Sequence, residues 1–263
     1  MRTNKARLGV ERLNAREVPA CIVTHPTPDT VAIVGDNAND TVLIRDNGAG
    51  VISGSATGAG VFAFAGIKNI RVATNGGDDR VSYTLYANML GTQQRNVTVD
   101  LGASTWSGSN QFVANLYNPA TGVGSDLLAR SSLALDVFGG SGRDVIFVNA
   151  FRDTDVAFGA RLSMNLFGQA GNDIIQVNWH GENDGQVSLY ADGGAGNDLI
   201  RGYLREDPGS TGVSSGQVRG GDGNDNLGLF MWTQNPPAIA VLDGGAGIDF
   251  GIGTANVAKV NIP

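Results

Sequence analysis

One short phrase recurs five times in the second half of the chain, and it limits the possible folds more than any other feature. The copies are GGSGRDVIF at 139–147, GQAGNDIIQ at 168–176, GGAGNDLIR at 193–201, GGDGNDNLG at 220–228 and GGAGIDFGI at 244–252. Four of them match GGxGxD in full, and the other has Gln169 in the second glycine position. Self-similarity at such a period is typical of a solenoid, in which each coil packs on the next.

The phrase also has the chemistry of a metal site. Glycine permits positive φ and sharp turns, which leave carbonyl oxygens free of a strand ladder. The aspartate adds a carboxylate, and calcium takes about 6–8 oxygen ligands of these two kinds. Successive aspartates are 29, 25, 27 and 24 residues apart, which indicates one motif per coil. We therefore expect calcium between stacked turns, at most about four ions in one column.

The predicted metal-binding residues are the glycines and aspartates of the five phrases. They are Gly139, Gly140, Gly142, Asp144, Gly168, Gly171, Asp173, Gly193, Gly194, Gly196, Asp198, Gly220, Gly221, Gly223, Asp225, Gly244, Gly245, Gly247 and Asp249. This segment resembles the calcium-binding repeats of RTX, or hemolysin-type, proteins, whose pattern is GGxGxDxUx with U a large aliphatic residue. The resemblance implies a β-roll or β-helix with Ca²⁺ as its cofactor. The alternative is a metal-free corner, in which each aspartate bonds to nearby backbone amides.

The same coil pattern can be followed towards the N-terminus. It aligns Asp40, Asp79 and Asn110 with the motif aspartates, which makes about eight coils. Short β-rich runs enter and leave each turn. Two residues after each aspartate position comes a residue that should point inward: Val42, Val81, Phe112, Ile146, Ile175, Ile200, Leu227 and Gly251. The predicted fold is all-β, a parallel β-solenoid that is right-handed because parallel crossovers nearly always are.

The expected organisation is one domain over 21–263 after a disordered, targeting-like segment at 1–20. Degenerate coils occupy 30–133, RTX-like coils 134–253 and a C-terminal cap 254–263. Within the first segment, LGVERLNAREVPA is similar to the LExLExRxxPA-type motif at the N-termini of planctomycete surface and secreted proteins. That resemblance implies an extracellular or cell-envelope location. Variable segments at 54–66, 118–132, 179–185 and 205–216 are expected as loops on one edge, where a partner would bind.

Composition excludes several classes of function. The net charge is −7, and without a basic cluster we expect no nucleic-acid partner. No apolar run is long enough to predict a membrane-spanning segment. The single cysteine, Cys21, rules out an internal disulfide. The 39 glycines and 16% charged residues suit a turn-rich β protein.

No catalytic residue is assigned, because no nucleophile–base arrangement is present. His180 lies near Glu182 and Asp184, a candidate metal or sugar contact whose simpler interpretation is a solvated loop. Asn115, Asn149 and Asn178 predict an asparagine ladder. Trp106, Trp179, Tyr203, Phe230 and Trp232 are candidate sugar platforms or covers for a solenoid edge.

The sequence favours a calcium-binding structural or adhesive module that acts outside the cell or in the envelope. The alternative is a carbohydrate-binding or polysaccharide-degrading β-helix of the lyase or glycoside hydrolase type, and enzyme activity stays open. The expected partners are calcium ions and a polysaccharide or other cell-surface component. Oligomeric state is undetermined.

Overall fold

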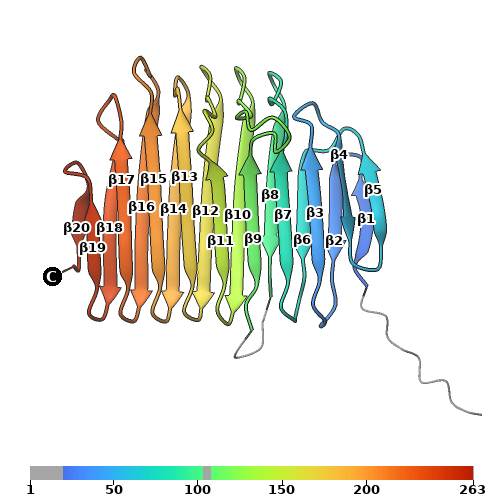
Figure 1. Ribbon diagram of the computed structural model, residues 1–263, viewed down its shortest axis with the longest axis horizontal. Coiled ribbons are helices and arrows are strands. Elements are labelled where there is room, and N and C mark those ends of the chain that lie inside the picture. Colours follow the sequence, from blue (N-terminus) through green and yellow to red (C-terminus); the bar gives the residue numbers. More distant parts are fainter. Residues whose placement is uncertain (1–19, 103–107, 263) are drawn as a thin grey trace, which may run out of the picture.

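The computed structural model describes residues 20–102 and 108–262, and these form strands and turns with no helix. The strands make two ten-stranded sheets, A and B, that face each other along the molecule (Figure 1). Sheet A consists, in order, of β1 (Ile22–Thr27), β2 (Thr30–Val34), β6 (Asn69–Ala73), β8 (Gln94–Asp100), β10 (Ser132–Ser141), β12 (Arg161–Ala170), β14 (Gln186–Ala195), β16 (Val213–Asp222), β18 (Ile239–Ala246) and β20 (Ala258–Val260). Sheet B consists, in order, of β19 (Phe250–Gly253), β17 (Asn226–Trp232), β15 (Leu199–Glu206), β13 (Ile174–Gly181), β11 (Val145–Ala150), β9 (Gln111–Leu116), β7 (Arg80–Leu85), β3 (Thr41–Asp46), β4 (Ile52–Ala56) and β5 (Gly60–Phe64).

The chain alternates between the two sheets through most of its length, so that a strand of sheet A leads into a strand of sheet B. Neighbouring strands within a sheet are parallel through most of the molecule; β10, for example, pairs with both β8 and β12. This winding confirms the predicted all-β parallel β-solenoid. The Gly–Asp phrases lie where sheet A passes into sheet B, along the lower edge in Figure 1.

The core is a layer of mostly apolar side chains between the two sheets. Inward and outward side chains alternate along each strand, as in the buried and half-buried positions of β11. The apolar position two residues after each corner residue is at most 1% exposed in seven coils, which confirms the prediction. At the eighth position, Gly251, the side chain of Ile262 fills the space, because a Cβ there would lie 2.3 Å from its Cδ1. Burial of each large apolar side chain contributes roughly 1.5–3 kcal/mol.

The N-terminal end of the solenoid is covered by antiparallel strands. Strand β1 pairs antiparallel with β2. In sheet B, β4 pairs antiparallel with β3 and β5 antiparallel with β4, so the segment 54–66 is largely strand and its prediction as a loop is wrong. His25 of β1 stacks on Phe64 of β5, with ring centroids 5.0 Å apart, so the two edge strands meet across the end of the core. Such strands protect the first coil from pairing with other chains.

The edge opposite the Gly–Asp corners is more ordered than predicted. The segments 118–132, 179–185 and 205–216 are not simply loops, since β13, β15 and β16 extend into the last two. Single-residue bridges join Met89 to Leu127, Leu127 to Val156, and Val156 to Asn183, so coil stacking continues there. The sequence does not show this because each coil contributes only one paired residue, too few for a visible period. The described residues contain no helix that could cross a membrane.

Candidate functional site

The candidate site is the column of carboxylates at the Gly–Asp corners. Each corner aspartate is at most 4% exposed and points along the stack. Its backbone N–H donates to the Oδ1 of the next coil's aspartate: Asp144 to Asp173 at 2.7 Å, Asp173 to Asp198 and Asp198 to Asp225 at 2.8 Å, and Asp225 to Asp249 at 2.9 Å. The structure therefore brings all five predicted aspartates together. One oxygen of each carboxylate acts as a backbone cap, as the metal-free alternative expects.

The second carboxylate oxygen has no such partner. The Oδ2 atoms of Asp79, Asp144, Asp173, Asp198, Asp225 and Asp249 are buried without a hydrogen bond among the described residues. A buried charged oxygen without a partner is costly. Either a proton on the carboxyl itself or a bound cation would satisfy these atoms.

Each of these oxygens in the five phrases lies close to a main-chain carbonyl of the next coil. The point where a Cβ on Gly193 would stand is 2.1 Å from Asp198 Oδ2 and 2.6 Å from the carbonyl oxygen of Gly220. At Gly168 the corresponding distances are 2.4 Å to Asp173 Oδ2 and 2.5 Å to the oxygen of Gly193. A carboxylate oxygen and a carbonyl oxygen thus flank the same glycine, and a proton or a cation between them would stabilise the pair.

Asn110 occupies the corner aspartate position in a coil that has no carboxylate there, and its hydrogen bonds differ from those of the aspartates. Its Oδ1 accepts the backbone N–H of Asp79 at 3.0 Å, so it occupies the column like the aspartates. Its Nδ2 donates to the carbonyl of Gly139 at 3.4 Å. The amide thus supplies the hydrogen that the aspartate corners lack.

Burial of the column changes the acidity of its members. Burial, reinforced by the neighbouring charge of Asp173, raises the pKa of Asp144 to about 7. Burial likewise raises the pKa of Asp198 to about 7 and that of Asp173 to about 6. The pKa of Asp225 is also raised, again mainly by burial. These carboxyls hold a negative charge reluctantly unless a cation compensates it.

The glycines of the phrase have a steric role. The first faces the carboxylate, as described for Gly193. A Cβ on the second, Gly221, would stand 1.9 Å from the carbonyl oxygen of Gly194, and one on the last, Gly223, 1.7 Å from that of Gly196. Gln169 fills the second position only by adopting φ of 76°. Close coil stacking therefore favours glycine at these positions whether or not a metal binds.

A second ladder runs beside the carboxylates, and sequence reasoning missed it. Asn172 Oδ1 accepts the backbone N–H of Asn197 at 2.7 Å, and Asn197 Oδ1 accepts that of Asn224 at 2.8 Å. The recurring Asn-Asp pair inside the phrase was the available signal. These amides cap turn N–H groups that would otherwise lack a partner.

The first corner of the solenoid has its own donors. Cys21 Sγ donates to Asp40 Oδ1 at 3.2 Å, and the backbone N–H of Asp36 donates to Asp40 Oδ2 at 3.0 Å. Burial, with the adjacent Asp40, raises the pKa of the Cys21 thiol to about 12, so the sulfur stays protonated. This corner needs no further ligand.

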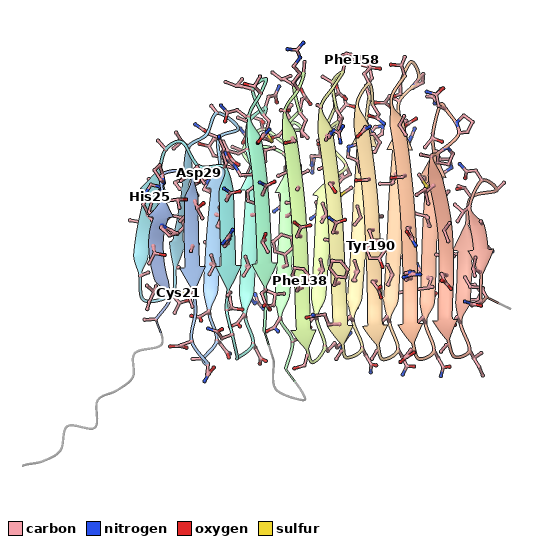
Figure 2. The ribbon with its side chains drawn as sticks, turned by 180° about the vertical axis from the view of Figure 1, so that it is seen from behind. Cys21, His25, Asp29, Phe138, Phe158 and Tyr190 are labelled. Carbon is pink, nitrogen blue, oxygen red and sulfur yellow. The ribbon has the colours of Figure 1, made fainter. Side chains whose placement is uncertain are left out.

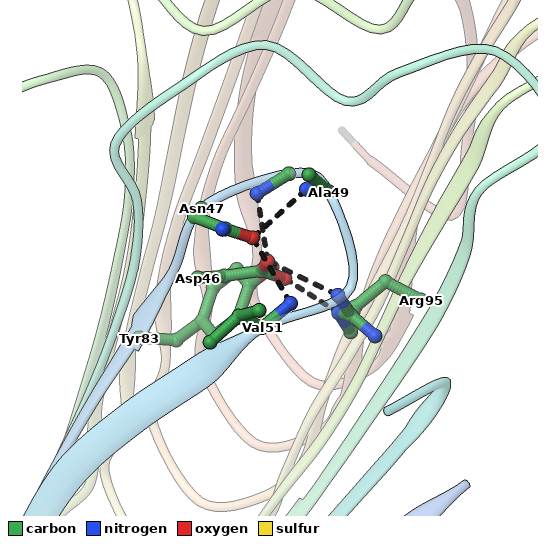
Figure 3. A network of polar contacts seen from close by, with 7 residues as sticks. Asp46, Asn47, Ala49, Val51, Tyr83 and Arg95 are labelled. Atoms are coloured by element: carbon green, nitrogen blue, oxygen red, sulfur yellow. Dashed lines mark hydrogen bonds and ion pairs between the residues drawn. The ribbon is translucent and has the colours of Figure 1, made fainter. Parts of the chain in front are cut away.

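A buried ion pair near the N-terminal end was also missed. Arg95 of β8 donates through Nε and Nη2 to the carboxylate of Asp46 at the end of β3, and Tyr83 Oη donates to the same carboxylate at 2.8 Å (Figure 3). All three residues are 0% exposed. Arg95 and Asp46 are 49 residues apart in the chain, so no local pattern could show their contact. The network joins sheet A to sheet B.

The structure gives His180 different neighbours from those predicted. Its Nε2 lies 2.8 Å from Asp207 Oδ1, and the ligating atoms of Asp153, His180 and Asp207 lie within 4.8 Å of one another. Asp184 instead accepts from Thr211, and the N–H of Glu182 donates to Asp155. Coil stacking, rather than closeness in the chain, selects these contacts.

The other predicted sites have mixed outcomes. Trp179 is 1% exposed and donates to the Thr154 carbonyl, so it is a core residue and the sugar-platform prediction for it is wrong. Asn149 Nδ2 donates to Asn115 Oδ1 at 3.1 Å, which confirms one step of the predicted ladder, and Asn178 is in register with them. Tyr203 and Phe230 stack with centroids 4.9 Å apart. Trp106 and the 1–19 part of the predicted targeting segment lie outside the described residues.

Comparison of the chain with protein-family models, curated proteins and solved structures finds no match.

Proposed function

We propose that this chain is a structural or adhesive β-solenoid module that acts outside the cell or in the envelope and is stabilised by calcium bound at its Gly–Asp corners. The observation that supports it most is the column of buried Oδ2 atoms that face carbonyl oxygens of the next coil. The Asn110 corner, where an amide hydrogen fills the same gap, indicates that the gap requires positive charge or a donor.

The donor set has the chemistry that calcium prefers. Carboxylates and main-chain carbonyls are hard oxygen ligands, and the five phrases contain no thiolate or imidazole that would favour a softer metal. The carboxylates of Asp144, Asp173, Asp198 and Asp225 would hold the ions, with the carbonyls of the facing glycines: Gly168, Gly193, Gly220 and Gly244. A bound divalent ion would neutralise the charge that burial makes unfavourable.

The proposed role is stabilisation of the stacked coils. Calcium binds the stacked corners and not the unfolded chain, so binding favours the folded solenoid. Extracellular modules bind calcium with Kd on the order of 10⁻⁴–10⁻³ M. A site at ten times its Kd adds about 1.4 kcal/mol, and several such sites would set whether the solenoid is folded where calcium is plentiful.

The test is a thermal melt followed by far-UV circular dichroism, in EGTA and with calcium titrated through that range. We expect the melting midpoint to rise with calcium by about 2–4 °C for each kcal/mol gained. Magnesium, which demands near-octahedral geometry and dehydrates reluctantly, should have a smaller effect. Asp225→Asn should reduce the calcium increment, because the amide donates a hydrogen where the cation would bind.

Asp222→Asn is the matched control. Asp222 belongs to the same turn as Asp225, but it is exposed and lies outside the carboxylate column. It should leave the calcium increment unchanged. Identical melts in EGTA and calcium would reject the calcium proposal and favour a metal-free scaffold whose corner carboxyls are protonated.

A further inference from the structure

The outer face of sheet A carries an aromatic group that the fold does not need for its core. Phe138 of β10 and Phe167 of β12 stack with centroids 5.0 Å apart and ring planes 5° from parallel. Tyr190 of β14 follows at 5.6 Å but is tilted by 47°. Phe138 and Tyr190 lie on strands in the middle of the solenoid (Figure 2). The group thus runs along the solenoid axis, across the strands.

A hollow lies next to Tyr190 on this face. Tyr190 lines it together with the small residues Ser188, Ser215 and Gly216 and the apolar Leu189 and Ile239. Asn165 and Gln217 bring amide groups to the same hollow. Asn165 Nδ2 donates to Asp136 Oδ1 at 2.7 Å, which orients that amide.

A second hollow adjoins the first one and is lined by ionic groups. Asp192, Arg219 and Asp243 occupy one row across β14, β16 and β18. Tyr190 Oη donates to Asp192 Oδ2 at 2.9 Å, and Arg219 Nε lies 3.9 Å from Asp243 Oδ2. The hydrogen bond orients the tyrosine hydroxyl, and the guanidinium lies near Asp243 at the second hollow.

An aromatic ring next to planar hydrogen-bonding groups is suited to a pyranose. The apolar C–H face of the sugar packs on the ring, and its hydroxyls pair with amide, carboxylate and guanidinium groups. Strands are about 4.8 Å apart, and the outward row of Asn165, Tyr190 and Gln217 presents a hydrogen-bonding group at each step along the axis, which favours an extended chain over a single sugar. Asp192, Asp222 and Asp243 outnumber Arg219 in the ionic hollow, so a polyanion would be repelled.

We propose that the outer face of sheet A, from β10 to β18, binds an uncharged linear polysaccharide laid along the solenoid axis. Tyr190 is the stacking platform, and Asn165, Gln217 and Arg219 contact the sugar hydroxyls. In the folded chain this binding needs no calcium at the corners, because Tyr190, Asn165, Gln217 and Arg219 are on the sheet face and not in the turns.

The test is affinity electrophoresis through gels that contain xylan, mixed-linkage glucan or galactomannan, with polygalacturonate as the acidic probe. We expect retardation by at least one neutral glycan and none by polygalacturonate. At a temperature where circular dichroism shows the chain folded both in EGTA and in calcium, the retardation should be equal in the two. Tyr190→Ala should weaken binding about tenfold, the scale of one lost aromatic contact. Tyr190→Phe, which keeps the ring, should retain most of the affinity.

Tyr203→Ala is the matched control, since Tyr203 is stacked on Phe230 on the opposite sheet. Its affinity should equal that of the wild type. The proposal is overturned if no neutral glycan retards the chain, if polygalacturonate binds as well, or if Tyr203→Ala weakens binding as much as Tyr190→Ala. If Tyr190→Ala lowers the melting midpoint, two other variants provide the test. Loss of glycan binding in Tyr190→Phe would contradict the proposal. Unchanged glycan binding in Arg219→Gln, which removes the charge, would also contradict it.

Discussion

Replacing one corner carboxylate by an amide should stabilise this protein at alkaline pH in the absence of calcium. The change is Asp198→Asn. At pH 8 without metal, the wild-type carboxyl is ionised, buried at 3% exposure, and faces the Gly220 carbonyl. The amide would keep the Oδ1 acceptor for the N–H of Asp173 and donate through Nδ2 to Gly220, as Asn110 does to Gly139.

The size and the pH dependence follow from the raised pKa. The pKa of Asp198 rises from 3.8 to about 7 on folding, chiefly through burial. Between these two pH values the folded chain binds more protons than the unfolded chain, so the free energy of unfolding falls as pH increases. One pKa unit corresponds to about 1.4 kcal/mol, which makes roughly 4 kcal/mol an upper bound. With relaxation and water entry, we expect Asp198→Asn to gain about 1–3 kcal/mol at pH 8.

The measurement is urea unfolding of wild type and variant in EGTA at pH 5 and pH 8. At pH 5 the wild-type carboxyl is protonated in the folded state and can donate like the amide, so the advantage of the variant should be clearly smaller than at pH 8. Saturating calcium at pH 8 should remove or reverse the advantage of the variant. A variant that is less stable than the wild type at pH 8 in EGTA, or a difference that does not change with pH, would refute the reasoning.

Three further changes test other parts of the structure. Gly193→Ala should lower the free energy of unfolding in urea by more than about 2 kcal/mol, because its Cβ would meet Asp198 Oδ2 and the Gly220 carbonyl. Gly60→Ala, which has open space around it, should cost only about 1 kcal/mol of backbone strain. Equal costs would contradict the packing argument. Arg95→Met should cost about 3–5 kcal/mol because it leaves Asp46 charged and buried, whereas the double variant with Asp46→Asn should recover part of that loss in the same assay. Asn197→Ala should cost about 1 kcal/mol by removing the cap on the Asn224 N–H, and a neutral result would mean that water replaces the amide.

The recurring phrase alone was enough to predict the solenoid and the contents of its rows. Residues one period apart become neighbours in a stacked coil, so the repeat predicted that Asp173 lies beside Asp198 and Ile175 beside Ile200, as they do. The inward apolar position could be read from the same period. The resemblance to calcium-binding repeats located the candidate site at the corners.

The hydrogen-bond and ion-pair partners of each side chain depend on contacts that the sequence does not show. The fold divides each corner carboxylate into an Oδ1 that caps an amide and an Oδ2 without a partner, and coil contact favours the glycines. It also pairs Arg95 with Asp46 and His180 with Asp207. The physical reason is that coils differ in length. Contacts between residues outside the repeat therefore depend on the number of residues in each coil. A repeat predicts which equivalent residues stack in rows, whereas distances across the core and between coils determine which other side chains are in contact.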